Sequence, residues 1–401
     1  MLPSDTRIAL PPFVAQPDGD DVIIGNPARN CFLAVPPDAA ALLRWLADGL
    51  TVGEACAAYE REYAASPDLE EFLATLAEQG FLPSAEESPA PTRAMRGHFE
   101  QISVSLARRV CSWQVSVAGL VLVAAAVGAS IADPSILPGP DALVFEHDQL
   151  LLAAGVALLT LVTVFFHELA HLVAARAADV PSRMGIGTRL WVLVAETDMS
   201  EIWFAPRRRR WVAFLAGPAL DVCLAAALLL AVFAVHRNLI ALPEMVLLLV
   251  RATTFVVFTR LLWQFYLFLP TDLYYALTTL FGCRNLMHDT QEYLVGWLAR
   301  LTRRVPAADQ SGVPPREMAV VRWFAFVWLG GRAVAFASLF LITLPVLGGY
   351  AAMLARGLGG DGQAVRPLLD GPPLLILAAA LQSFGLLAWL RSLVLEYRRS
   401  A

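Results

Sequence analysis

The sequence is poor in charge. Of its 401 residues, 16% are Asp, Glu, Lys or Arg, whereas 57% are hydrophobic, and the mean hydropathy is +0.59. Soluble domains carry about 25% charged residues. A chain with this little charge cannot cover so much apolar mass with a water-facing surface. The composition therefore argues against a wholly soluble enzyme or a disordered chain, and it favours a polytopic membrane protein.

Several motif classes are also missing. No GxGxxG and no GxxxxGK[ST] segment occurs, so no nucleotide is predicted as a partner. The first 30 residues hold no basic segment followed by an apolar run, so we expect no cleaved signal peptide. No CxxC pair occurs, which indicates neither a disulfide framework nor a thiolate zinc site. The cysteines are odd in number and scattered, at Cys31, Cys56, Cys111, Cys223 and Cys283.

The charge that is present is unevenly placed. Residues 1–90 hold 15 acidic residues and 4 Arg, a net charge of −11, whereas residues 91–401 carry a net charge of +6. The break predicts an acidic soluble module ahead of a basic membrane module. Binding to nucleic acid requires a basic face. We therefore expect no nucleic-acid partner.

Long apolar runs follow the break. Six of them are long enough to cross about 30 Å of hydrocarbon. The predicted fold is therefore mainly α, a polytopic membrane bundle of about six transmembrane helices in contact with the lipid bilayer. The six predicted spans are 112–132, 150–175, 211–235, 245–269, 321–346 and 373–393.

Arginine placement predicts the direction of these spans. If residues 1–110 are cytoplasmic, the segments on that side from residue 91 onward hold 20 Arg and the loops on the other side hold three. Cytoplasmic segments of membrane proteins are enriched in positive charge. We therefore predict a multi-pass protein of the cell membrane, with both termini in the cytoplasm.

Residues 12–84 have the pattern of a small α+β domain. The run DVIIGNPARNCFLAV, residues 21–35, places two apolar segments around an Asn-Pro turn, as in a hairpin. Three helices are expected after it, at 36–49, 51–64 and 66–82. Thr51 and Glu54 form the spacing of a capping box at the start of the second helix. The order of a hairpin and three helices is typical of a winged-helix-like fold.

This order, with the closing run LEEFLATLAEQGFL, resembles PqqD-type domains. The resemblance implies recognition of the leader of a ribosomally made precursor peptide and points to a bacterial source. Such a leader would add as a strand to a sheet edge. The alternative from the residues alone is a generic winged-helix module that makes other protein contacts.

The chemistry is concentrated in HELAH, inside the second span. Positions i and i+4 share one face of a helix, so His167 and His171 can offer two imidazoles to one metal ion. Glu168 lies beside them as a candidate general base, the arrangement of HExxH zinc hydrolases. Catalytic zinc needs a third protein ligand. Asp272 and Glu196 are the two candidates.

The HExxH motif in a span, a short β-containing loop and a late Asp together resemble the site-2 protease family of intramembrane zinc metalloproteases. The resemblance covers about residues 112–282 and implies that Asp272 is the third zinc ligand. The family's second motif, NxxPxPxLDG, has its Asn where Gln264 stands here. Leu273 replaces its last Gly.

The family's GPxxN motif matches Gly217 and Pro218, and Asp221 stands where Asn is expected. The resemblance implies that these three residues and Gln264 lie near the substrate backbone. An ionised Asp221 could not donate a hydrogen bond as Asn does. Its alternative role is an ion pair with Arg260 or Arg251, because charges inside a span seek partners.

The predicted domain order is a PqqD-like cytoplasmic domain (1–90), a basic linker (91–110), a zinc metallopeptidase core (111–282), a cytoplasmic loop (283–320), and two more spans with a basic tail (321–401). The predicted function is a zinc endopeptidase that matures a ribosomally synthesised modified peptide after leader recognition. Two alternatives remain at this point. One is regulated intramembrane proteolysis of a membrane-anchored signalling protein, and the other is a non-catalytic transport or immunity component.

Overall fold

The computed structural model describes most of the chain up to residue 338. The predicted sixth span, 373–393, lies mostly outside the described residues. These are 3–82, 98–143, 149–302 and 313–338, with gaps at 9, 19–20, 27–30, 100, 190–191, 284 and 314, together with 340, 344, 380, 383–387 and 391.

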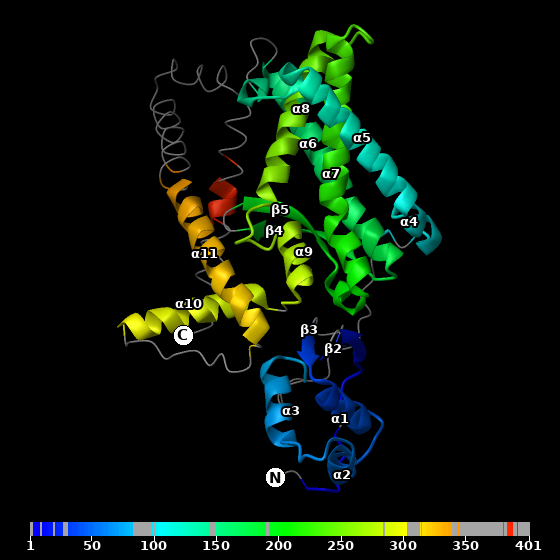
Figure 1. The fold of residues 1–401 in the computed structure, drawn as a ribbon, viewed down its shortest axis with the longest axis vertical. Helices are drawn as coiled ribbons and strands as arrows, with labels where there is room; N and C mark the ends of the chain where they lie inside the picture. The colour runs from blue at the N-terminus through cyan, green and yellow to red at the C-terminus, as the bar shows by residue number, and fades with distance from the viewer. Residues whose placement is uncertain are drawn as a thin grey trace, which may run out of the picture.

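The chain begins with a small α+β domain (Figure 1). Strands β1 (Val14–Asp18), β2 (Asp21–Asn26) and β3 (Cys31–Val35) form an antiparallel sheet in the order β1-β2-β3. The predicted hairpin at 21–35 is thus confirmed as β2 and β3. The strand β1 was not predicted, because Pro17 interrupts a segment with little alternation of apolar residues.

Three helices complete this domain, as predicted. They are α1 (Pro37–Ala47), α2 (Val52–Tyr63) and α3 (Leu69–Glu78). The capping box is confirmed, since the Thr51 side chain accepts from the Glu54 N–H and the Glu54 carboxylate accepts from the Thr51 N–H. Ile24, Leu43 and Phe81 are fully buried where the sheet meets the helices. The domain therefore has its own core.

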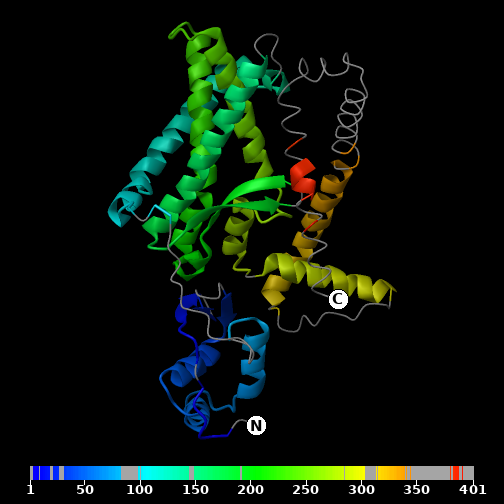
Figure 2. The same cartoon turned by 180° about the vertical axis from the view of Figure 1, so that it is seen from behind.

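The rest of the described chain is a bundle of long apolar helices (Figures 1 and 2). Within the described residues, five helices are long and apolar enough to cross a membrane. Their spans are Val104–Ala132, which joins α4 (Val104–Val110) and α5 (Trp113–Ala132), Leu151–Ala177 in α6 (Gln149–Ala177), α7 (Arg207–His236), α8 (Glu244–Trp263), and Pro315–Ala337 in α11 (Pro315–Ser338).

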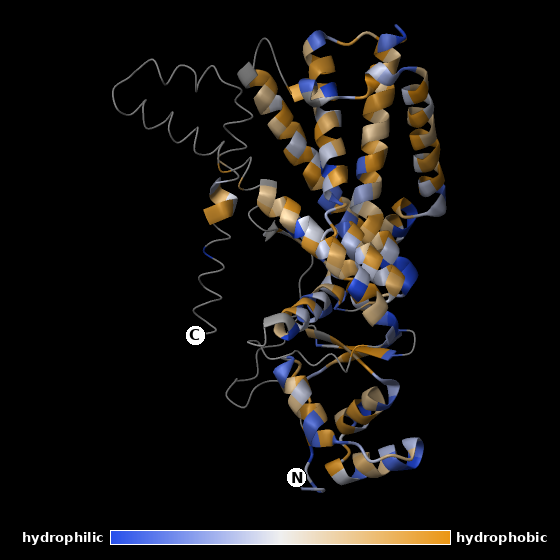
Figure 3. Cartoon of the chain, turned by 60° about the vertical axis from the view of Figure 1, so that its left-hand side comes forward, coloured by the Kyte–Doolittle hydropathy of each residue, from blue (hydrophilic) through white to orange (hydrophobic). Residues whose placement is uncertain are grey.

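The helices of the bundle are built largely of hydrophobic residues (Figure 3), and several of their large apolar side chains are exposed. Leu120, Ile131 and Phe326 are 68%, 76% and 79% exposed. Large apolar side chains exposed to this degree are unfavourable in water and favourable in lipid. The predicted multi-pass helical architecture is therefore supported. Helix α7 is central and packs against α5, α6, α8 and the later helix α9 (Asp272–Phe281).

A β-hairpin follows α6, as expected for the polar segment after the second span. Strands β4 (Arg183–Arg189) and β5 (Val192–Asp198) are antiparallel, and Met184 stands opposite Thr197. The hairpin crosses the bundle beside α6, and β5 makes the closer approach to that helix (Figure 2).

Three predicted boundaries differ from the structure. The first span begins at Val104, within the predicted linker, rather than at residue 112. The fourth span ends at Trp263 rather than at residue 269, and the chain turns before α9 begins at Asp272. Asp272 therefore starts a new helix instead of ending a span. The predicted loop at 283–320 contains α10 (Leu286–Thr302) and the beginning of α11. Gly282 ends α9 with a φ of +70°, a left-handed C-cap that frees the chain to turn into α10.

The first domain contacts the bundle at the end where α6 finishes and α7 starts (Figure 1). Asp18 forms an ion pair of 2.9 Å with Arg210, which is almost fully buried at the start of α7. The segment that joins the domain to α4 also contacts α6, because Arg176 Nε donates to the Ile102 carbonyl. The domain is thus connected to the bundle by noncovalent contacts as well as by the chain.

Candidate metal centre

The HELAH segment lies in the C-terminal half of α6, which is the half nearer to the first domain (Figure 1). His167, Glu168 and His171 are all buried, and the Nε2 atoms of the two histidines lie 3.3 Å apart. This spacing follows from the helix, because residues four apart lie one above the other on one face. The predicted pair of imidazoles is therefore present, with Glu168 next to it in sequence.

Asp272 joins the two histidines from the first turn of α9. Its Oδ2 lies 3.2 Å from His167 Nε2 and 3.3 Å from His171 Nε2. Gln264 holds the carboxylate in place, since its Nε2 donates to Asp272 Oδ2 at 2.7 Å and its Oε1 accepts from the Asp272 N–H. Gln264 and Asp272 thus close the turn between α8 and α9, and they are the two residues that the motif spacing had paired.

The three atoms have the spacing of a tetrahedral zinc site. All three separations are 3.2–3.3 Å. Zinc bonds to nitrogen and oxygen are about 2.0–2.1 Å, so ligand atoms at tetrahedral angles lie about 3.3 Å apart. Within the described residues, His167, His171 and Asp272 form the cluster of metal-binding groups. The donor set therefore fits zinc.

The outer nitrogens of both imidazoles are hydrogen-bonded. His171 Nδ1 lies 2.8 Å from the Ala213 carbonyl, which can only accept, so His171 must donate from Nδ1. His167 Nδ1 lies 2.9 Å from an Asp221 carboxylate oxygen. In the neutral form of each ring, donation from Nδ1 leaves the lone pair at Nε2. Two lone pairs and a carboxylate converge on one point, where a cation would satisfy all three.

Gly217 lets α7 approach this point. A Cβ built at Gly217 would overlap the Nε2 atoms of both His167 and His171. Only glycine fits where α7 crosses the two ligands. Pro218 follows inside the helix and is buried. The pair was expected near the substrate, whereas the structure gives Gly217 a role in closing the space around the histidines.

Asp221 is buried with no measurable exposure. Arg260 donates to both of its oxygens, with Nε at 2.7 Å from Oδ2 and Nη2 on Oδ1. The remaining guanidinium nitrogen donates to Thr163 at 3.1 Å. This geometry supports the predicted ion pair with Arg260 rather than with Arg251. It does not support a direct substrate contact, because Arg260 and His167 already occupy the carboxylate.

Gln264 and Glu196 also have defined positions. Gln264 is buried and uses its amide to hold Asp272, so its role here is to position a ligand. Glu196 lies on β5 opposite Gly185, outside the cluster of three ligand atoms. Of the two candidates for third ligand, the geometry favours Asp272.

One contact at the site had no signal in the sequence. The Thr197 hydroxyl on β5 lies 2.7 Å from Glu168 Oε2 and 3.1 Å from the Glu168 carbonyl. Thr197 is 29 residues from Glu168, and a threonine in a polar hairpin is unremarkable by composition. Only the folding of the hairpin onto α6 brings the two together.

One comparison with known proteins matched the segment of the chain that contains this centre. Residues 155–303 match Peptidase family M50, and the matched segment contains all three ligand candidates and Glu168. Members of this family are zinc metalloproteases. The fold and the match therefore indicate a membrane-embedded metallopeptidase, and they support the resemblance to site-2 proteases. No curated protein and no solved structure matched the chain. The match does not include residues 1–90, so their PqqD-like character stays a prediction.

Proposed function

We propose that the chain is an intramembrane zinc endopeptidase in which His167, His171 and Asp272 bind Zn²⁺ and Glu168 is the general base. The convergence of three potential metal-binding atoms beside a buried glutamate carries this proposal. A non-catalytic metal site would not require a carboxylate next to its ligands. The presence of Glu168 thus favours catalysis over a structural role.

Each residue of the site has a separate role in peptide hydrolysis. When bound, zinc supplies Lewis-acid activation of water and of the scissile carbonyl. Glu168 accepts a proton from the attacking water as the oxygen bonds to the carbonyl carbon. The same carboxyl then gives this proton to the leaving nitrogen as the C–N bond breaks. His167 and His171 are fixed by Asp221 and Ala213, so the site keeps its geometry through the cycle.

The hairpin supplies a surface for the substrate. A peptide bond inside a helix is shielded by the helix hydrogen bonds, so the substrate must be extended before cleavage. An extended chain can pair with the edge of a two-stranded hairpin. Either Met184–Ile186 or residues 190–195 would supply the pairing segment, and Ile186 is 81% exposed. We propose that this hairpin aligns the substrate next to Glu168.

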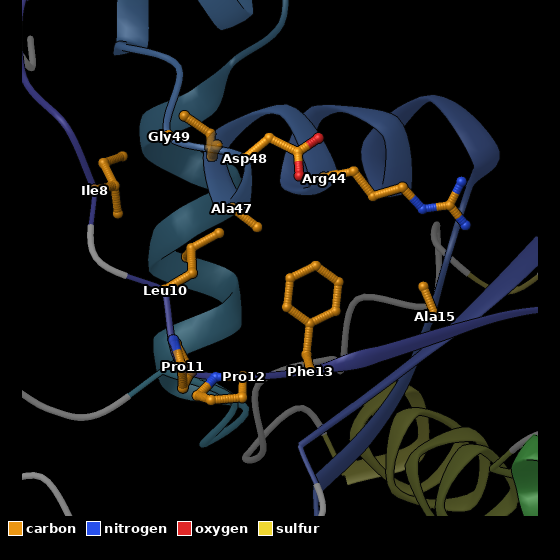
Figure 4. Close-up of a pocket in the computed structure, with 11 residues that line it drawn as sticks. Ile8, Leu10, Pro11, Pro12, Phe13, Ala15, Arg44, Ala47, Asp48 and Gly49 are labelled. Atoms are coloured by element: carbon orange, nitrogen blue, oxygen red, sulfur yellow. The ribbon is translucent and has the colours of Figure 1, made fainter.

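The first domain supplies a second, more distant contact for a peptide. β1 and β3 are the outer strands of its sheet, and either edge could accept an added strand. A pocket of about 740 Å³ lies beside β1, with Leu10 and Phe13 directed toward α1 and with Arg44 and Asp48 at its rim (Figure 4). These features support capture of an extended peptide that carries an apolar side chain.

Together these contacts favour peptide maturation. The domain that would hold the leader is joined to α7 by the Asp18–Arg210 pair, at the end of the bundle nearer to the metal centre. A captured peptide would therefore be held close to the site that cleaves it. We propose that the protein removes the leader of a modified precursor peptide at the cytoplasmic side of the cell membrane, with both termini on that side.

The test is cleavage of a precursor peptide encoded beside this protein and expressed with it. We expect the parent to release a shortened peptide, Glu168→Gln to release none, and Glu244→Gln, an exposed control on α8, to match the parent. Bound zinc should fall from about one ion per chain to none in His167→Ala. Cleavage by Glu168→Gln at the parental rate would refute the assigned base. Cleavage only of membrane-anchored signalling proteins would favour regulated proteolysis instead.

A further inference from the structure

The general base is held by a residue of the hairpin. Thr197 Oγ1 lies 2.7 Å from Glu168 Oε2, and Glu168 is 8% exposed. We propose that Thr197 is a positioning residue that fixes the Glu168 carboxylate for proton transfer. This inference rests on the proposed peptidase function. It assigns to Thr197 a role that neither the HExxH motif nor the family match includes.

The hydroxyl has one proton to give. Its shorter contact is to the carboxylate at 2.7 Å, and the Glu168 carbonyl lies farther away at 3.1 Å. Hydrogen bonds to a charged acceptor are shorter and about twice as strong as those between neutral groups. The proton therefore belongs mainly to the carboxylate. With Oε2 held in this way, Oε1 is the oxygen left to receive a proton from water.

A glutamate needs such a restraint. Its side chain has three rotatable bonds, and immobilising a side chain of this kind has one of the larger entropy costs among the amino acids. The two histidines are fixed at their outer nitrogens, whereas Glu168 gains its fixed position from Thr197. A base held within hydrogen-bonding reach of its proton acts faster than one that samples several rotamers.

The position of Thr197 connects this restraint to the substrate surface. Thr197 stands opposite Met184 in the hairpin that we expect to align the peptide. The Met184 N–H in turn donates to His98 Nδ1, in the segment that leads from the first domain. One register position of the hairpin thus contacts both the general base and that segment. Movement of the hairpin on substrate binding would shift the base with it.

Kinetics of three variants test the role. Thr197→Val keeps the shape and removes the hydroxyl, whereas Thr197→Ser keeps the hydroxyl. Thr160→Val is the matched control, because among the described residues the Thr160 hydroxyl bonds only to the Val156 carbonyl of its own helix. We expect kcat to fall about tenfold or more in Thr197→Val, with KM and bound zinc unchanged. Thr197→Ser should stay within about threefold of the parent, and Thr160→Val should match it.

A loss confined to KM or to zinc content would overturn the proposal, and so would equal kcat values for parent and Thr197→Val. If Thr197→Val fails to fold, Thr197→Ala is compared with Thr197→Ser in the same way. These outcomes differ from what would be seen if the proposed peptidase function were wrong. If it were wrong, the parent and Glu168→Gln would be equally inactive.

A second measurement needs no catalysis and no metal. In a double-mutant cycle on the metal-free protein, Thr197→Val should lower Tm in the parent by about 2 °C more than it does in Glu168→Ala. The difference measures the contact between the two side chains. Additive shifts in Tm would show that Thr197 supports only the backbone of α6, and the proposal would be wrong.

Discussion

Asp221 supports the zinc ligand His167 from behind, and its replacement by Asn should weaken metal binding. One of its oxygens faces His167 Nδ1 at 2.9 Å, and Arg260 donates to both. An amide offers one acceptor oxygen in place of two. At the place of Oδ1 the Asn nitrogen would face Arg260 Nη2, and at the place of Oδ2 it would face both His167 Nδ1 and Arg260 Nε. At least one donor would therefore lose its partner.

The size of the effect can be set from the contacts. Loss of a carboxylate behind a metal-binding histidine lowers metal affinity about 10- to 100-fold, or about 1.4–2.8 kcal/mol. Breaking a buried ion pair costs about 3–5 kcal/mol of stability. The Arg260 side chain is 15% exposed, so water can partly replace its partner. We therefore expect about 3 kcal/mol, the lower end of that range.

The assay separates these two effects. Zinc affinity is measured by competition with a chelator, and stability is measured by thermal unfolding of the metal-free protein. The variants are Asp221→Asn, Arg260→Met, and both together, with the exposed Asp141→Asn as control. The double variant should be more stable than Asp221→Asn, because no unpaired charge remains. Its zinc affinity should stay low. Parental zinc affinity in Asp221→Asn, or no recovery of stability in the double variant, would refute the reasoning.

Three further predictions concern the same centre and the first domain. Gly217→Ala should abolish zinc binding, because its Cβ would overlap both histidine Nε2 atoms, whereas Gly128→Ala on α5, which has no neighbour within 4 Å, should bind zinc as the parent does; metal analysis of both variants decides. Asp272→Ala should lose zinc while Glu196→Ala keeps it, and the reverse result in the same measurement would make Glu196 the third ligand. The hydrogen bond to Asp38 raises the pKa of Tyr59 to about 12, above its ordinary value of 10.0, so the stability from this bond is present below pH 10 and is lost as the pH rises toward 12. Protease protection of residues 3–82 should therefore fall between pH 10 and 12 in the parent and change less in Tyr59→Phe.

Features that depend on neighbouring residues in the chain could be predicted from the sequence. The HELAH spacing places two histidines on one face of any helix, whatever surrounds it. Thr51 and Glu54 form their capping box within four residues. The hairpin after α6 follows from its polar and β-branched composition. In each case the sequence contains both partners of the interaction at a fixed and short separation.

Features that depend on tertiary contacts could be predicted only in part. The apolar run at 245–269 continues past Trp263, so hydropathy alone extends the span, whereas the bonds between Gln264 and Asp272 close a turn. Arg260 and Arg251 are equivalent by composition, and only the packing of α8 against α7 selects Arg260 for Asp221. Thr197 has no sequence signal, because its partner lies on another element.

The chain has few ionisable groups, and several of those inside the bundle lie at the metal centre. Asp221 and Arg260 neutralise each other, and they do so in direct contact with His167. Asp272 and Glu168 then remain as two carboxylates at the two metal-binding imidazoles. Uncompensated charge at this depth in a membrane bundle is costly. A divalent cation would balance the pair, whereas a monovalent ion would leave one carboxylate uncompensated. The arrangement therefore favours a divalent metal, on grounds of charge as well as of ligand type and spacing.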